Sequence, residues 1–277
     1  MIYVTSIVLQ HLGGVVKIFF LWFLCSTASF PLPLRYAITD TLSLISLIFC
    51  HSKRISVRKN LKSIFKRKPS IAEILRVFVE YGRYWAEYPL VNKIWKSSTV
   101  VYHSQQFPPS EPCFLGVTFH MGNFELFGNI IKNTTQKDFQ VVAERLRPEY
   151  IAEFFKRTRQ SHGIKTVVHD DLRQILRVMK EGSPLGVLCD RMVGGRGVEV
   201  RFFGKRVRMP LNIVGYALQK KIPVYVAYCI HKDRVLNVYC RKIGGESDFD
   251  TAVQTIVSTL EEAIVRFPFQ WHVLSAL

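Results

Sequence analysis

Strand-length apolar runs alternate with amphipathic segments along the chain after residue 70, and this alternation restricts the folds that it can adopt. Apolar runs of strand length lie at residues 112–119, 139–143, 164–168, 185–189, 198–203, 224–230 and 235–241. Segments with the apolar spacing of helices lie at residues 71–87, 122–131, 148–159, 170–181, 211–220 and 248–266. We therefore predict an α/β fold in which helices flank a mixed, largely parallel sheet.

The first fifty residues differ from the rest because their charged side chains are confined to Lys17, Arg35 and Asp40. Residues 18–34 form an uncharged run that would measure about 25 Å as a helix, the short limit for crossing a bilayer. We predict that residues 1–50 are a hydrophobic membrane anchor. The alternative is a cleaved signal peptide, but the charged segment that begins such a peptide is missing.

Two prolines divide this predicted anchor. Pro31 and Pro33 are expected to end the first apolar helix before the membrane interface. The apolar run at residues 41–50 is too short to span a bilayer, so we expect it to lie along the membrane surface or to dip into it.

A strongly basic segment follows at residues 51–69, with no acidic residue before Glu73. The positive-inside rule places this membrane-proximal segment, and the domain predicted at residues 70–277, on the cytoplasmic side. Each such charge contributes about 1 kcal/mol to binding an anionic lipid surface. The net charge of +17 requires anionic partners. We expect these to be membrane lipids and not nucleic acid, because the sequence has no recognised nucleic-acid-binding motif.

His120 lies where a predicted strand ends and a helix begins, which is where α/β sheets collect their catalytic groups. Glu125 follows five residues later, and a turn at Gly122 can bring its carboxylate back toward the imidazole. A carboxylate fixes the imidazole tautomer and makes the other ring nitrogen a better base. The pair therefore suggests a general base, although taken alone it fits a structural histidine at a strand end better.

Further charged residues follow other predicted strands. Glu144 and Arg145 come after one of them, and Asp190 and Arg191 after another. Because the carboxyl ends of parallel strands share one edge of a sheet, Glu144 is a second carboxylate that can meet His120. The alternative for Asp190 is a helix cap or a pair with an arginine.

The segment His120-Met-Gly-Asn-Phe-Glu125 is one of five motif blocks spread over the chain. The others are Val57-Arg-Lys-Asn-Leu61, Arg159…Gly163, Asp190-Arg191 followed by Gly197-Val-Glu-Val-Arg-Phe-Phe-Gly204, and Glu261-Glu262…Pro268-Phe-Gln-Trp271. In this order they resemble the blocks of the lipid A biosynthesis acyltransferases, whose histidine block is H-x-G-N-W/F-D/E. That family also includes the acyltransferases of phosphatidylinositol mannosides.

The resemblance implies an α/β acyltransferase, similar in fold to the glycerolipid acyltransferases, at the cytoplasmic face of a bacterial inner membrane. It implies transfer of a fatty acyl chain from an acyl carrier protein or coenzyme A thioester to a hydroxyl of a glycolipid. His120 would then be the general base. The thioester is a substrate, so no cofactor is expected, and the six widely spaced cysteines predict no metal site.

For the remaining site residues, the resemblance implies that Glu125 supports His120 as the carboxylate of its motif. In the mannoside branch, the glutamate of an A-E-R-L-x-P block orients the histidine. Residues 143–148 match that block, so Glu144 competes with Glu125 for the orienting role. We predict substrate contacts from Asn123, Arg145, Arg159, Asp190 and Arg191, although Arg159 also fits an ordinary arginine at a helix end.

The acceptor that we favour at this point is a lipid A precursor. A phosphatidylinositol mannoside or a lysophospholipid is the alternative acceptor for the same chemistry. A non-catalytic protein that binds anionic membranes through its basic segment is the alternative of a different class, and it has no need of His120.

Overall fold

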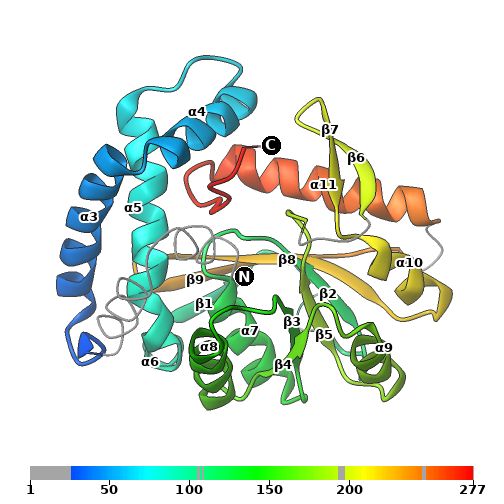
Figure 1. Cartoon of the computed structure of the whole chain (residues 1–277). Coiled ribbons are helices and arrows are strands. Elements are labelled where there is room, and N and C mark those ends of the chain that lie inside the picture. Colours follow the sequence, from blue (N-terminus) through cyan, green and yellow to red (C-terminus); the bar gives the residue numbers. More distant parts are fainter. Residues whose placement is uncertain (1–25, 105–106, 108, 193–196, 245–247, 277) are drawn as a thin grey trace.

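The computed structural model describes residues 26–104, 107, 109–192, 197–244 and 248–276. Residues 1–25, which include residues 18–25 of the predicted apolar run 18–34, lie outside the described part of the chain. The described chain forms a central sheet with helices packed around it (Figure 1).

Seven strands form the central sheet in the order β1-β9-β8-β2-β5-β3-β4. Their bounds are Thr99–Tyr102 (β1), Leu115–Thr118 (β2), Gln140–Ala143 (β3), Lys165–Val168 (β4), Leu185–Leu188 (β5), Val224–Lys232 (β8) and Val235–Lys242 (β9). Neighbouring strands run parallel except for β8 and β9, which form an antiparallel pair. The predicted mixed, largely parallel sheet is therefore confirmed. A separate antiparallel hairpin joins β6 (Val198–Phe202) to β7 (Lys205–Met209).

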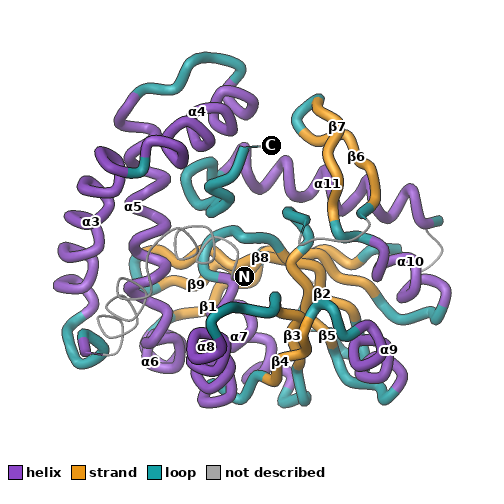
Figure 2. The backbone as a smooth tube through the Cα atoms, in the orientation of Figure 1, coloured by secondary structure: helices purple, strands orange, loops and turns teal. Residues whose placement is uncertain are grey.

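Helices cover both faces of the sheet (Figure 2). One buried apolar cluster includes side chains of α4 (His51–Phe65), α5 (Ile71–Glu87), α9 (Leu172–Lys180), α10 (Asn212–Gln219) and α11 (Phe249–Arg266). Another includes side chains of α6 (Val91–Ser97) and α7 (Phe124–Thr135). Strand β8 contributes to both, because successive side chains of a strand point to opposite faces: Val224 and Val226 enter the first cluster, Tyr225 and Ala227 the second.

Several of these elements were not predicted from the sequence. The basic segment forms the regular helix α4, whose Val57, Leu61 and Ile64 are buried in the first cluster. Strands β1 and β7 also went unpredicted, because their residues are mostly exposed and carry little apolar signal. Helix α8 (Glu149–Ser161) begins after Pro148, as predicted.

The N-terminal region differs from its prediction. Residues Leu32–Phe49 form one helix, α3, so the run at residues 41–50 is the second half of a longer helix and not a separate surface segment. Pro31 and Pro33 begin this helix instead of ending one, because a proline is tolerated in the first turn, where its missing N–H has no partner to lose. By length and composition alone, α3 could cross a membrane.

Helix α3 packs closely along α5. A Cβ atom at Gly82 would lie 2.6 Å from Oγ of Ser43 and 3.1 Å from the carbonyl oxygen of Thr39. Only a glycine therefore allows the two helices to approach this closely.

Candidate active site

The carboxyl ends of β2, β5 and β3 lie side by side and bring the predicted site residues to one edge of the sheet. Thr118 pairs with Leu188 across β2 and β5. His120 and Asp190 each lie two residues beyond this pair, so they face one another. The strand register itself therefore places the histidine opposite an aspartate.

Asp190 holds His120 through two hydrogen bonds. Its Oδ1 lies 2.7 Å from Nδ1 of the imidazole, and its Oδ2 accepts from the backbone N–H of His120 at 3.0 Å. Nε1 of Trp271 also donates to Oδ2, at 2.9 Å. All three residues are buried, with 3–4% of each exposed. The imidazole is thus fixed in one orientation by a carboxylate whose partners are all donors.

The ionisation of the pair follows from this burial and these contacts. Burial lowers the pKa of His120 to about 4, although the Asp190 carboxylate acts to raise it. Burial acts to raise the pKa of Asp190, but the charge and hydrogen bonds of His120, with the bond from Trp271, lower it to about 2. At neutral pH an ionised Asp190 therefore accepts the Nδ1 proton of a neutral His120, and Nε2 carries the free lone pair. Nε2 is buried and has no hydrogen-bond partner among the residues that the structure describes.

The turn after His120 is pinned by the C-terminal segment and by β8. Gly122 adopts φ = 57° and donates its N–H to the carbonyl oxygen of Gln270 at 2.9 Å. The backbone N–H of His272 donates to the carbonyl oxygen of His120 at 2.7 Å. Asn123 then begins α7, with its Oδ1 accepting from the N–H of Leu126. The position of the imidazole therefore depends on residues from the end of the chain.

Glu125 does not contact His120 in this structure. It lies in the first turn of α7 and pairs with Arg159 of α8, with Oε1 and Nε 3.2 Å apart. Both side chains are almost completely buried. Burial raises the pKa of Glu125, and Arg159 opposes that shift. This pair joins two helices beneath the site, so the expected contact of Glu125 with the imidazole is replaced by a contact with an arginine.

Glu144 also faces an arginine. Its Oε2 lies 3.6 Å from Nη2 of Arg191. Continuing the register between β3 and β5 places Glu144 opposite Cys189, one residue short of Asp190 and on the other side of the pleat. The sequence-based expectation that Glu144 orients His120 therefore does not match the geometry, in which Asp190 holds that position.

The predicted substrate contacts are placed unequally. Arg191 lies near enough to His120 for its charge to act on the pKa of the imidazole. Nδ2 of Asn123 donates to Oε2 of Glu87 at 2.5 Å, and its Oδ1 caps α7. Arg145 pairs with Asp170 at 2.9 Å, and about half of each side chain is exposed. The structure thus gathers Asn123, Arg159, Asp190 and Arg191 with His120 and leaves Arg145 on the surface.

The sequence contained a signal for Asp190 that went unused. Leu115-Gly-Val begins β2 and Leu185-Gly-Val begins β5, and His120 and Asp190 each come five residues after the leucine. Two parallel strands that share this pattern align without an offset. In the sequence, Trp271 stood out only as part of the closing motif block. Nothing in the sequence pointed to Glu87 as a site residue, because it ends helix α5, far from His120 along the chain.

Two cavities adjoin the site. An apolar one lies between the sheet and α7, lined in part by Gly116, Gly128, Phe139 and Gly186, and it reaches Glu125. A polar one of about 520 Å³ lies behind the turn after His120, lined in part by Glu87, Gly122, Asn123 and His231. Among the described residues, no three His, Cys, Asp or Glu side chains gather as metal ligands would.

We expect Gly122→Ala to destabilise the protein more than Gly182→Ala. Both glycines have positive φ, 57° and 78°, so each alanine strains the backbone. At position 122 the added Cβ would also collide with the carbonyl oxygen of Cys229, whereas at 182 it meets nothing within 4 Å. Thermal unfolding should therefore show a much larger fall in melting temperature for Gly122→Ala, and equal falls would contradict the close approach.

We expect Glu125→Gln to cost about 3–5 kcal/mol of unfolding free energy, because it leaves the buried Arg159 without its carboxylate. The matched control is Glu149→Gln, which removes an exposed partner of Arg147 and should change stability little. Urea denaturation measures both variants. Equal losses would show that the Glu125–Arg159 pair does not stabilise the fold.

The family model of the bacterial lipid A biosynthesis acyltransferases matches residues 5–277. A phosphatidylinositol mannoside acyltransferase of Mycobacterium tuberculosis (strain CDC 1551 / Oshkosh) is 25% identical over 251 residues, which cover 81% of this chain and 77% of that protein. One from Mycolicibacterium smegmatis is 24% identical over 163 residues, 56% of this chain and 53% of that protein.

Among solved structures, the 1-acyl-sn-glycerophosphate (LPA) acyltransferase of Thermotoga maritima aligns with 82% of this chain and 97% of its own, with a TM-score of 0.39 and 15% identity. The family match is the decisive comparison, because it extends over nearly the whole chain. It includes the histidine turn, the strand ends and the C-terminal segment that together form the site. The chain therefore belongs to the bacterial lipid A biosynthesis acyltransferase family and is an acyltransferase.

Proposed function

We propose that this protein is a membrane-bound O-acyltransferase that moves a fatty acyl chain from a thioester to a hydroxyl of a glycolipid, with His120 as the general base. The observation that carries the proposal is the buried His120–Asp190 pair, which leaves Nε2 of the imidazole with a free lone pair. A thioester is already an activated acyl donor, so the protein needs a base and no nucleophile of its own.

In the proposed reaction, Nε2 of His120 accepts the proton of the acceptor hydroxyl as its oxygen attacks the thioester carbonyl carbon. The tetrahedral intermediate then expels the thiolate, which takes the proton back from the imidazolium. Asp190 holds the imidazole in the required tautomer and stabilises the positive charge that forms on it. Such general-base assistance typically contributes about 10²–10⁴-fold to the rate.

The oxyanion of the intermediate requires hydrogen-bond donors. Arg159 is committed to Glu125 in the buried pair, which favours a positioning role for both residues. Arg191 also has a carboxylate neighbour, with its Nη2 3.6 Å from Oε2 of Glu144, but it directly follows Asp190, the partner of His120, at the end of β5. We therefore assign Arg191 to the oxyanion or to an anionic group of the substrate, and Asn123 to holding the turn.

The family match, whose description names acyltransferases of lipid A biosynthesis, supports a fatty acyl substrate. The apolar cavity between the sheet and α7 holds only about 40 Å³. An acyl chain would therefore have to displace side chains such as Phe139, which lies beside Gly186, in order to enter it. The donor is then an acyl carrier protein or coenzyme A thioester that acts as a substrate, with no separate cofactor.

The acceptor has two candidates, each supported by one comparison. The family description names lipid A biosynthesis, and the curated relatives are named for phosphatidylinositol mannosides. Both are glycolipids with sugar hydroxyls. We propose a sugar hydroxyl of such a glycolipid at the cytoplasmic face of a bacterial inner membrane, with a lipid A precursor as the first acceptor and a phosphatidylinositol mannoside as the second.

The test is acyl transfer by the purified full chain in lipid vesicles. Radiolabelled acyl carrier protein and coenzyme A thioesters are offered with each glycolipid, and His120→Ala is the control. We expect label in one glycolipid and its loss in the folded variant. Transfer by folded His120→Ala would overturn the mechanism, and transfer only to a lysophospholipid would overturn the glycolipid acceptor.

Asp190→Asn is expected to lower kcat about 10²–10⁴-fold while leaving the shape of the site intact. The groups that contact the two carboxylate oxygens are all donors, so an amide places an N–H against one of them and removes the charge. Glu144→Gln is the comparison, and we expect it to cost much less. A loss from Glu144→Gln as large as that from Asp190→Asn would contradict the special role given to Asp190.

The pH dependence of kcat/KM should follow the lowered pKa of His120. The base works only when it is neutral, so activity falls as the pH drops through about 4 and stays nearly flat from pH 8 to pH 5.5. An unshifted histidine would lose about tenfold by pH 5.5. Circular dichroism at each pH confirms that the protein stays folded, and an acidic limb near 6.5 would contradict the assignment.

A further inference from the structure

Helix α3 distributes its polar and apolar side chains in the opposite way to a helix on the surface of a water-soluble protein. The side that faces the protein carries Arg35, Thr39, Ser43 and Leu47, all buried. The outward side is mostly apolar, with the exposed polar residue Thr41 among its members. Its exposed large hydrophobic residues are Leu34, Leu42, Leu44, Ile45, Ile48 and Phe49. Ile48 is 65% exposed and Phe49 is 78% exposed. We call these six residues the α3 apolar face.

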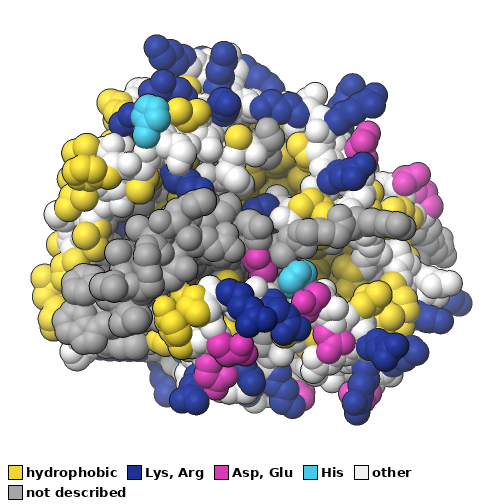
Figure 3. Space-filling model, viewed as in Figure 1, with side chains coloured by type: hydrophobic (Ala, Val, Ile, Leu, Met, Phe, Trp, Pro, Cys, Tyr) yellow, Lys and Arg dark blue, Asp and Glu magenta, His cyan; other side chains and the backbone are white. Residues whose placement is uncertain are grey.

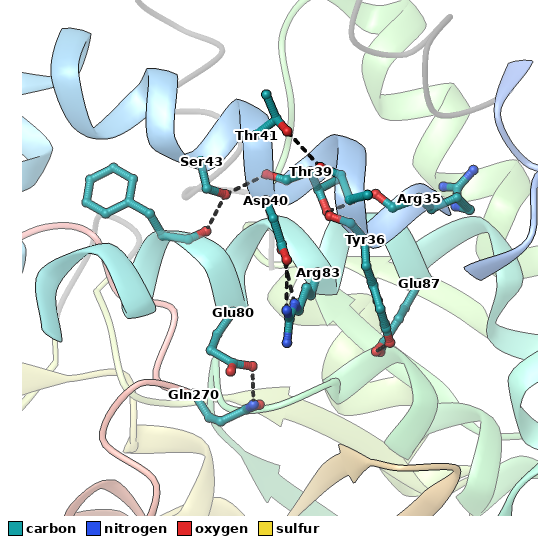
Figure 4. Close-up of polar contacts among 12 residues, drawn as sticks. Arg35, Tyr36, Thr39, Asp40, Thr41, Ser43, Glu80, Arg83, Glu87 and Gln270 are labelled. Atoms are coloured by element: carbon teal, nitrogen blue, oxygen red, sulfur yellow. Dashed lines mark hydrogen bonds and ion pairs between the residues drawn. The ribbon is translucent and has the colours of Figure 1, made fainter. Parts of the chain in front are cut away.

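The inward side of α3 is fixed to α5 by hydrogen bonds. Nε of Arg35 donates to the carbonyl oxygen of Ala86 at 2.7 Å, and Oγ of Ser43 donates to that of Phe78 at 2.9 Å. Figure 4 shows this contact from the side, with Asp40 paired to Arg83. Nη2 of Arg83 lies 2.8 Å from Oδ2 of Asp40. These contacts hold the polar side of the helix against the protein, although Nη2 of Arg35 has no hydrogen-bond partner among the described residues, whereas the large apolar side chains on the other side stay exposed.

A basic surface adjoins the α3 apolar face. Helix α4 follows directly and exposes Arg58, Lys59 and Lys62, and the chain after it exposes Lys66, Arg67 and Lys68. In Figure 3, hydrophobic side chains lie along the left edge over α3, and Lys and Arg side chains lie along the top over α4. A hydrophobic patch bordered by cations fits the interface of an anionic lipid layer, which offers acyl chains beside phosphates.

We infer that α3 lies flat in the membrane interface, with its apolar face among the acyl chains and the cations of α4 on anionic head groups. This inference rests on the proposed function only in that the acceptor is a membrane lipid. Such an arrangement would give the enzyme a defined orientation toward the lipid layer that holds its acceptor. Helix α3 would then be the helix that docks the protein onto this layer.

The attachment of α3 to α5 argues against a spanning helix. To cross a bilayer, α3 would have to carry α5 with it, and α5 holds Glu80, Arg83 and Glu87. Separating the two helices would expose the guanidinium of Arg35 to hydrocarbon, which is costly. An orientation in the plane of the interface keeps every polar contact and still buries the apolar face.

Charge argues against a second copy of this chain as the partner. Symmetric pairing through the α3 apolar face would bring two α4 helices, each with its row of cations, toward one another. Like charges placed face to face disfavour such a contact. Anionic lipid turns the same cations into an attraction.

The test uses the full chain in vesicles of phosphatidylglycerol and phosphatidylcholine that contain photoactivatable phospholipids. The reactive group sits either near the head group or at the end of the acyl chain, and labelled tryptic peptides are identified by mass spectrometry. We expect the shallow probe to label the peptide of residues 36–53 along its length. The control is the peptide of residues 166–173, whose Leu172 is 62% exposed and should stay unlabelled.

The double variant Ile48→Ser with Phe49→Ser should reduce the label in residues 36–53 roughly tenfold, because two large apolar side chains no longer enter the lipid. Leu172→Ser should leave it unchanged. An unlabelled peptide overturns the inference, and so does deep labelling confined to the middle of α3, which indicates a span. Cross-linking between two copies without lipid label indicates a dimer and overturns it too. Acyl transfer measured in the same vesicles tests the proposed function separately.

Discussion

The hydrogen bond between His120 and Asp190 ties together everything else in the site. It joins the ends of two adjacent parallel strands, so its length is set by the register of the sheet. A slip of one residue between β2 and β5 would turn one of the two side chains to the opposite face. The geometry of the site depends in this sense on the core, because the buried residues that fix the register also fix the distance between the imidazole and the carboxylate.

The surrounding contacts explain why a carboxylate can remain charged there. Burial alone would favour a protonated Asp190, and three donors reverse this preference. One of the donors is Trp271, which comes from a segment that closes over the site from the end of the chain. Burial also disfavours the charged form of His120 and so lowers its pKa. The two shifts together keep the imidazole neutral and ready to accept a proton.

The sequence allowed the sheet, most helices and the position of His120 to be predicted, because apolar periodicity and strand ends are local features. The carboxylate partner was not identified, because that choice depends on the register between two strands whose site residues lie 70 positions apart, and the shared Leu-Gly-Val start of the two strands was not used to align them. Glu125 was attractive since it is near in sequence, yet the helix that begins at Phe124 carries it toward Arg159. Helix α3 was misjudged for a related reason. Its prolines and short apolar runs suggested two pieces, and only the contacts with α5 show one continuous helix with an inward polar side.

Glu87 links two parts of the protein that are otherwise described separately. One of its carboxylate oxygens accepts from the hydroxyl of Tyr36 on α3 at 2.6 Å and lies 2.7 Å from Nδ1 of His231. The other accepts from Asn123, which sets the turn that carries His120. Helix α3 and the turn after His120 are therefore both hydrogen-bonded to the carboxylate of Glu87. A displacement of α3 relative to the sheet would shift the same carboxylate that holds the turn of His120, so a movement of this outer helix would reach the proposed base through Glu87.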